Sequence, residues 1–371
     1  MKKFISVTII LLIEWQILYN QTVNSASHPI TEIFTDFHLN LNDTSKTTGF
    51  ALNRAYLGYN FTPEGHFSGA IIINAGKPDD LAPGSTPRIY AYFREASITW
   101  SDEKLKVSFG ITGTHLFDFQ QGFWGKRYVA NTYQSINGYG FVADLGIAMV
   151  YQISDILKAD LTIMNGEGYG NVQLDNSIRT ATGLTITPDP HLAFRIYGDI
   201  TRVDGLWQPM VIGFAGFKNE MMTIGAEITY KSNLDLIKGH HAWGFSGTGA
   251  VRVAKKTELF ARYDYSTSVL VPEDSQKWNY LKDGSLQVMG IQYAFNENIK
   301  IALDYQGTHP YDKIWIDQMQ FLSMPCSSLE DKIQASRPAL RAFIFTSAIS
   351  SPFFAKISAT AFSRLLNGKS I

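Results

Sequence analysis

A short basic and aromatic segment holds the residues best suited to interact with a passing solute. Phe123, Trp124, Lys126 and Arg127 lie within five consecutive positions. Cationic groups and aromatic rings at the narrow point of a water-filled passage select among solutes by charge and size. If the surrounding elements enclose such a passage and place this segment at its narrowest point, Lys126 and Arg127 are the best selectivity candidates.

Other charged residues lie on segments in which apolar and polar residues alternate. If the apolar register faces lipid, the polar register faces an interior that both signs of charge line. The basic set is Arg54, Lys104, Lys106, Arg195, Arg252, Arg262 and Lys300, and the acidic set is Asp199, Glu227, Glu258, Asp264 and Asp304. Opposite charges on adjacent strands create a transverse field that sorts solutes. The alternative is that they only hydrate and cross-link the wall.

Two further charged residues, Arg94 and Glu95, fit neither register, because their segment has apolar residues in both.

The sequence lacks the patterns of common enzyme classes. It has no Gly-x-Ser-x-Gly motif and one cysteine, Cys326. The glycine-rich stretch 166–170 follows a strand pattern but opens no helix, unlike a dinucleotide-binding loop. Residues 27–313 hold 24 Lys and Arg against 29 Asp and Glu, a net charge of −5, which argues against nucleic acid as a partner. We predict no enzymatic activity, no cofactor and no metal.

The elements that carry these residues are predicted to be about fifteen β-strands. Apolar and polar residues alternate clearly in 221–231, and the pattern recurs between Thr31 and Gly307 with no hydrophobic core left over. An antiparallel transmembrane β-barrel has this composition, because its outside meets lipid and its lumen meets water. The expected strands are 32–42, 50–61, 66–75, 89–100, 104–112, 139–151, 155–165, 177–187, 192–201, 208–218, 221–231, 241–254, 256–266, 285–295 and 298–306.

Short and long connections alternate along the chain, and this parity predicts a topology. The even connections are short turns, whereas most odd ones are long, with 202–207 the modest exception. Outer-membrane barrels have short periplasmic turns and long external loops. A soluble β-sandwich has no reason to keep such a parity.

This topology is testable by labelling. A cysteine at Asp79, in an odd loop, should react with an impermeant thiol reagent on intact cells. A cysteine at Asp102, in an even turn, should not. Equal labelling of the two variants would contradict the barrel topology.

The longest connection, 113–138, is too aromatic for a loop that extends into water. We predict that it folds into the barrel and narrows it at Phe123, Trp124, Lys126 and Arg127. The alternative is that it packs on the rim or on a neighbouring subunit.

Several segments resemble the outer-membrane porins related to the phosphate-selective porins O and P. They are residues 50–59, 67–69, 123–128 and 135–145. The resemblance implies a barrel of sixteen strands, assembled as a homotrimer, in the outer membrane of a Gram-negative bacterium. The arginine ladder of the phosphate-selective members is not matched residue by residue.

The two ends differ from the barrel pattern. Residues 1–26 have the basic start, apolar run and small-residue end of a secretory signal. Residues 27–313 carry the strands. We predict that 314–371 is an aberrant tail, a frame-shifted reading of a true last strand.

The genetic code supports the frame shift. The shifted frame across 314–329 permits an alternating sixteenth strand that ends on phenylalanine, although the written frame stops alternating near Tyr311. We expect the written frame to leave the first and last strands unpaired and prone to aggregation. Resequencing the locus decides between the frames; a confirmed present frame, with 314–329 paired to the first strand, would refute the shift.

The predicted function is passive diffusion of small hydrophilic solutes across the outer membrane, with lipid as the surrounding partner. The alternatives are an anion channel, for phosphate for instance, and a structural or adhesion barrel with a blocked lumen. Channel conductance separates the three.

Overall fold

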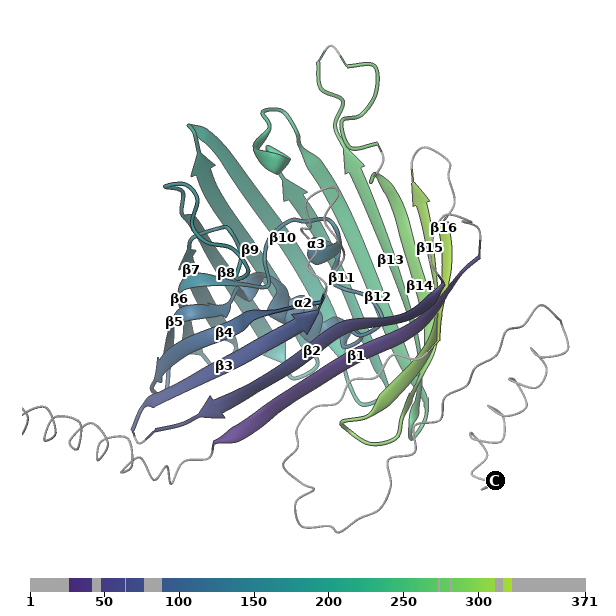
Figure 1. Ribbon diagram of the computed structural model, residues 1–371, viewed down its shortest axis with the longest axis horizontal. Helices are drawn as coiled ribbons and strands as arrows, with labels where there is room; N and C mark the ends of the chain where they lie inside the picture. The colour runs from purple at the N-terminus through teal and green to yellow at the C-terminus, as the bar shows by residue number, and fades with distance from the viewer. Residues whose placement is uncertain are drawn as a thin grey trace, which may run out of the picture. The chain divides into compact units, whose positions relative to one another are not determined.

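The computed structural model describes residues 27–41, 48–63, 65–76, 89–272, 274–280, 282–310 and 316–321. Within them sixteen strands form one closed barrel, in which every strand pairs antiparallel with its sequence neighbours (Figure 1). The first eight are β1 (His28–Asn40), β2 (Gly49–Phe61), β3 (Phe67–Gly76), β4 (Tyr90–Ser101), β5 (Leu105–Gly113), β6 (Ala143–Ser154), β7 (Leu157–Met164) and β8 (Arg179–Asp189). The others are β9 (Leu192–Val203), β10 (Leu206–Lys218), β11 (Met222–Lys231), β12 (Ala242–Ala254), β13 (Thr257–Ser268), β14 (Gly284–Ala294), β15 (Lys300–Pro310) and β16 (Ile316–Phe321).

The strands expose apolar side chains and bury polar ones. On β11, Ile224 and Ile228 are exposed on the outer face, whereas Glu227, Thr229 and Lys231 are buried on the inner face. A soluble protein has the reverse arrangement, because water rewards exposed polar groups. An apolar outside around a polar lumen is the arrangement of a transmembrane barrel.

The predicted fold class and all fifteen predicted strands are confirmed. Three boundaries differ from the prediction by four residues: β1 begins at His28 and not at 32, β15 ends at Pro310 and not at 306, and β6 begins at Ala143 and not at 139. Tyr139 and Val142 instead belong to a buried cluster inside the barrel, so their apolar character reflects packing and not a strand. No helix in the described part of the chain is long and apolar enough to span a bilayer.

The connections follow the predicted parity with one sharp exception. β9 and β10 belong to an odd pair, yet only Asp204 and Gly205 join them. Both have positive φ, 48° and 86°, as a two-residue hairpin turn requires. The barrel wall is therefore low at this point of the rim that carries the odd connections. Asp102 lies exposed in the β4–β5 turn, whereas Asp79 is outside the described residues.

The barrel is closed by a sixteenth strand read in the present frame, which corrects our expectation of unpaired first and last strands. β16 pairs with β15 from Leu303↔Phe321 to Thr308↔Ile316, and with β1 from Phe37↔Phe321 to Asn40↔Gln318. A ladder uses backbone groups, so a segment without alternating side chains can still form one.

This closing strand is short. β16 has six residues, and its ladder reaches only the last four residues of the thirteen-residue β1 in the described part of the chain. The signal segment 1–26 and the tail 322–371 lie outside the described residues, so the signal and the frame shift stay predictions.

Candidate functional site

The long connection between β5 and β6 lies inside the barrel, as predicted, and contains α2 (His115–Trp124) and α3 (Tyr133–Ile136) (Figure 1). Its entry is fixed by Thr114, whose backbone N–H donates to the carbonyl of Val142 (3.1 Å) and whose hydroxyl donates to that of Phe141 (2.5 Å). α2 ends at Trp124 and is capped by Gly125, which has a left-handed φ of 62° and whose backbone N–H donates to the carbonyl of Gln121. We name residues 114–142 the inner loop.

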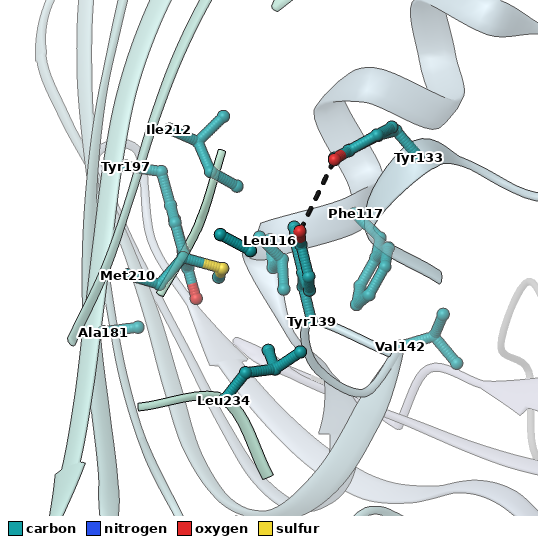
Figure 2. Close-up of a cluster of buried hydrophobic side chains, with 11 residues drawn as sticks. Leu116, Phe117, Tyr133, Tyr139, Val142, Ala181, Tyr197, Met210, Ile212 and Leu234 are labelled. Atoms are coloured by element: carbon teal, nitrogen blue, oxygen red, sulfur yellow. Dashed lines mark hydrogen bonds between the residues drawn. The ribbon is translucent and has the colours of Figure 1, made fainter. Parts of the chain in front are cut away.

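One apolar cluster fixes the inner loop to the β8–β10 wall. Figure 2 shows Leu116, Phe117 and Tyr139 of the loop facing Met210 and Ile212 of β10. The remaining members are Tyr133, Val142, Ala181, Tyr197, Leu234 and Ala242. Because all are buried, this cluster is a small hydrophobic core enclosed by a polar lumen.

A second apolar cluster fixes the next part of the inner loop to the other side of the barrel. Tyr128 makes an edge contact with the ring of Phe34 of β1, and Trp124 makes an edge contact with the ring of Phe260 of β13. The other members are Val129, Ala130, Val288 and Ala302. The inner loop thus touches several separated strands, which excludes packing on the rim alone.

Polar contacts from the wall satisfy the backbone of the inner loop. Arg195 donates to the carbonyl of His115 (3.0 Å), Lys231 to that of Tyr139 (2.7 Å) and Gln306 to that of Val129 (3.1 Å). Buried carbonyls need such partners, since an unpaired one costs about 1–3 kcal/mol. The loop is therefore a fixed part of the barrel interior.

Three of the seven predicted lumen cations form ion pairs with the wall in the described part of the chain. Arg54 contacts Glu32 (2.7 Å), Arg195 contacts Asp160 (2.6 Å) and Arg262 contacts Asp264 (2.5 Å). The arginines are buried, so these pairs cross-link the wall, as the simpler of our two interpretations has it.

The two predicted aromatic residues of the loop also serve packing. Phe123 lies against Phe119 (5.3 Å between ring centroids) and Phe214 of β10 (4.9 Å), and Trp124 donates its indole N–H to the carbonyl of Ala130.

The two predicted selectivity cations have different surroundings. Lys126 is buried against the rings of Trp124 and Phe260 and forms an ion pair with Glu258. Arg127 is half-buried and donates to the side-chain oxygen of Gln121 (2.8 Å), while its Nε has no partner among the described residues. Lys126 therefore holds the loop, whereas Arg127 has no carboxylate partner among the described residues.

The Lys126–Glu258 pair gives a stability prediction. Lys126→Met should lower the free energy of unfolding by about 2–3 kcal/mol, because a largely buried carboxylate loses its partner. The double variant Lys126→Met with Glu258→Gln should recover most of this loss. Thermal unfolding in detergent, followed by near-UV circular dichroism, measures the stability of both variants. Equal stability of the wild type and the single variant would contradict a stabilising role of the Lys126–Glu258 ion pair.

Two predicted lysines lie at the turn end of β5. Lys104 is not on a strand, which corrects its predicted lumen position: it is exposed in the β4–β5 turn, where its backbone N–H donates to Asp102 (2.9 Å). Asp102 forms the turn and interrupts the alternation here, so the lumen register of β5 does not extend back to Lys104. Lys106 is in the lumen register with buried Ser108, and is exposed.

The sequence missed Arg94, and a β-bulge is the reason. β3 pairs Ile72 with Glu95 and Ile73 with Phe93, so Arg94 is an extra residue in β4. A bulge re-aims side chains and resets the alternation, which accounts for apolar residues in both registers. The Arg94 side chain points inward, with a donor 3.5 Å from the carbonyl of Val142 and its guanidinium 5.6 Å from the ring of Tyr169.

A second bulge lies beside Arg54. β1 pairs Phe34 with Arg54 and Thr35 with Leu52, so Asn53 is the extra residue in β2. Bulges are over-represented next to functional sites. Arg54 and Arg94 thus both lie at or beside a bulge.

Three arginines, Arg54, Arg94 and Arg127, form what we name the cationic cluster. Burial, together with the positive charges of Arg54 and Arg94, lowers the pKa of Arg127 to about 10. Arg127 thus remains charged at neutral pH, and Arg54 and Arg94 are the positive charges that act on it. Arg54 has a carboxylate partner, whereas Arg94 and Arg127 have none among the described residues.

Aromatic and amide groups surround the cationic cluster. Register pairs Glu32 of β1 with Tyr56 of β2, Tyr56 with Asn74 of β3, and Asn74 with Tyr92 of β4. Tyr169, from the glycine-rich stretch 166–170, packs on Tyr92 (5.6 Å between centroids).

Several polar atoms around the cluster are buried without a partner in the described part of the chain. They are Nε and Nη1 of Arg94, Nε of Arg127 and the side-chain oxygen of Asn74. Buried polar atoms of this kind are commonly satisfied by ordered water. No group of three His, Cys, Asp or Glu side chains in the same part of the chain could hold a metal ion.

No protein-family model and no curated protein matches the sequence. Among solved structures the chain is similar to OmpT of Vibrio cholerae, with a TM-score of 0.57 at 13% identity, over 82% of this chain and 98% of that one. The anion-selective porin from Comamonas acidovorans gives 0.56 at 11% identity, over 82% and 100%. Pseudomonas putida OprB gives 0.56 at 9%, over 82% and 94%. At these identities the likeness shows the fold: the chain has the β-barrel fold of the outer-membrane porins.

Proposed function

We propose that this protein is a porin of a Gram-negative outer membrane, a passive channel for small hydrophilic solutes with no catalytic activity and no cofactor. One observation carries the proposal: a closed sixteen-stranded barrel with an apolar outside and a charged inside is narrowed by an inward-folded loop. A homotrimeric assembly is part of the proposal, on the resemblance to the porin O and P group.

Liposome swelling tests the channel. Liposomes that contain the protein should swell in isotonic solutions of small neutral sugars, at rates that fall steeply with sugar size, because the inner loop limits the passage. Protein-free liposomes are the control. Swelling no faster than the control would favour the alternative of a structural barrel with a blocked lumen.

We further propose a preference for anions, which the cationic cluster favours. Arg94 and Arg127 have no carboxylate partner in the described part of the chain, whereas Arg195 and Arg262 are neutralised by Asp160 and Asp264. Guanidinium donors suit the planar or tetrahedral oxygens of carboxylate and phosphate. Phosphate is thus one candidate among small oxyanions.

A further inference from the structure

Arg202 is unusual among the basic residues of the barrel because its strand directs it outward. On β9, Arg195, Tyr197, Asp199 and Thr201 are buried in the inward register, so Arg202 shares the outward register with the exposed Ile196 and Ile200. By the same alternation, every other arginine and lysine of the described strands is in the inward register. A cation on the outer face of a membrane barrel requires an explanation.

The depth of Arg202 explains how the barrel tolerates it. An outward arginine costs about 2–4 kcal/mol at the bilayer midplane but only about 0–1 kcal/mol near the interface. Arg202 is the penultimate residue of β9, two positions beyond Ile200 and beside the Asp204–Gly205 turn. The guanidinium therefore lies roughly 6–7 Å past the last apolar residue of this register, at the level where lipid headgroups begin.

A tryptophan holds the guanidinium at this level. Arg202 and Trp207 are register partners on β9 and β10, and the guanidinium carbon lies 5.2 Å from the centre of the exposed indole. Tryptophan is typical of membrane interfaces, since its ring is apolar and its N–H is polar. In the described part of the chain the arginines that form ion pairs are Arg54, Arg179, Arg195 and Arg262, and Arg202 forms none. The nearby Asp204 carboxylate is exposed in the turn. The donors of Arg202 are thus free to bind an anion.

The residues around Arg202 and Trp207 also have the character of a membrane–water interface. On the next two strands, Tyr230 and Trp243 are register partners in the outward register, with ring centroids 4.5 Å apart. Asn233 of the β11–β12 loop donates to the carbonyl of Trp207 (2.7 Å), which brings this loop, with the exposed Lys238, to the Arg202 side of the barrel. The short β9–β10 turn leaves Arg202 itself uncovered from above.

We propose that Arg202 and Trp207 bind the phosphate group of a phosphorylated lipid in the outer leaflet. Arginine matches phosphate through two parallel N–H donors, and the lipid chains would cover the apolar residues below it, Ile200 and Val211. This inference rests on the membrane topology of the proposed function, which places the β9–β10 turn outside.

Lipid binding to the purified, folded barrel in detergent tests the site. The probe is bisphosphorylated lipid A, titrated while the thermal unfolding temperature is followed. Arg202→Ala should raise the half-saturating lipid concentration about tenfold, and Arg202→Lys, which loses the paired donors, should raise it less. Arg252→Ala is the matched control, an exposed arginine in the inward register of β12, and should bind as the wild type does.

Three results would overturn the assignment. They are equal binding by wild type and Arg202→Ala, equal binding of lipid A from which both phosphates have been removed, and full reproduction of the thermal shift by inorganic phosphate. Conductance of the Arg202→Ala barrel should equal that of the wild type. A silent wild-type channel that still binds lipid A through Arg202 would refute the proposed function and leave this site standing.

Discussion

Replacing Arg94 and Arg127 together by glutamine should abolish the preference of the channel for anions. Both guanidinium groups have N–H donors without a hydrogen-bond partner, and neither forms an ion pair with a carboxylate of the described residues. An unpaired charge in a narrow, partly dehydrated passage acts on every ion that passes, because the low dielectric strengthens the field. The anion-to-cation permeability ratio should fall about tenfold in the double variant.

Reversal potentials under a salt gradient measure this ratio. Lys106→Gln is the matched control, since this exposed lumen-register lysine lies at the turn end of β5, away from the cationic cluster. It should change the ratio little, because an exposed charge is screened by salt. If the double variant kept the wild-type permeability ratio, the cationic cluster would not be the cause of the anion preference.

Removing residues 120–128 from the inner loop should raise the single-channel conductance about two- to fourfold, since this segment fills the passage at its narrow point. The deletion takes out Trp124 and Tyr128, which pack on Phe34 and Phe260, and the Lys126–Glu258 clamp. The barrel itself should persist, because its strands are joined by ladders that do not involve the inner loop.

A deletion of similar kind in another loop controls for general damage. Residues 172–175 lie in the β7–β8 connection, where Val172 and Leu174 are exposed, so their loss should leave the conductance unchanged. Heat-modifiable migration on electrophoresis verifies that both deletion variants fold. A folded 120–128 variant with wild-type conductance would show that the inner loop does not limit the channel.

The barrel was predictable from the sequence because lipid and lumen impose a strict two-residue period on each strand. The pattern of β11 identified its inward Glu227 and its outward Ile228. The inward fold of the inner loop was predictable for a related reason: a segment with Leu116, Phe117 and Trp124 needs a buried partner. Both inferences depend on burial alone, which a sequence reports well.

The site was less predictable because it depends on partners distant in the sequence. Lys126 and Arg127 are adjacent, yet one meets Glu258 and the other approaches Arg54 and Arg94. No local pattern distinguishes a paired cation from a free one. Arg94 was hidden by its bulge, although apolar residues in both registers of one strand are a usable signal of a bulge. The closing strand was missed since its ladder does not require alternation.

Single-channel recording of the wild-type protein in a planar bilayer tests the central claim most directly. With a tenfold gradient of potassium chloride across the membrane, the protein should give discrete, long-lived current steps. The reversal potential should have the sign of the chloride equilibrium potential, because the guanidinium groups of Arg94 and Arg127, which have no carboxylate partner among the described residues, favour anions. A folded barrel that inserts without current steps would contradict the proposal that the protein is a channel. A reversal potential with the sign of the potassium equilibrium potential would contradict the proposal that the cationic cluster makes it prefer anions.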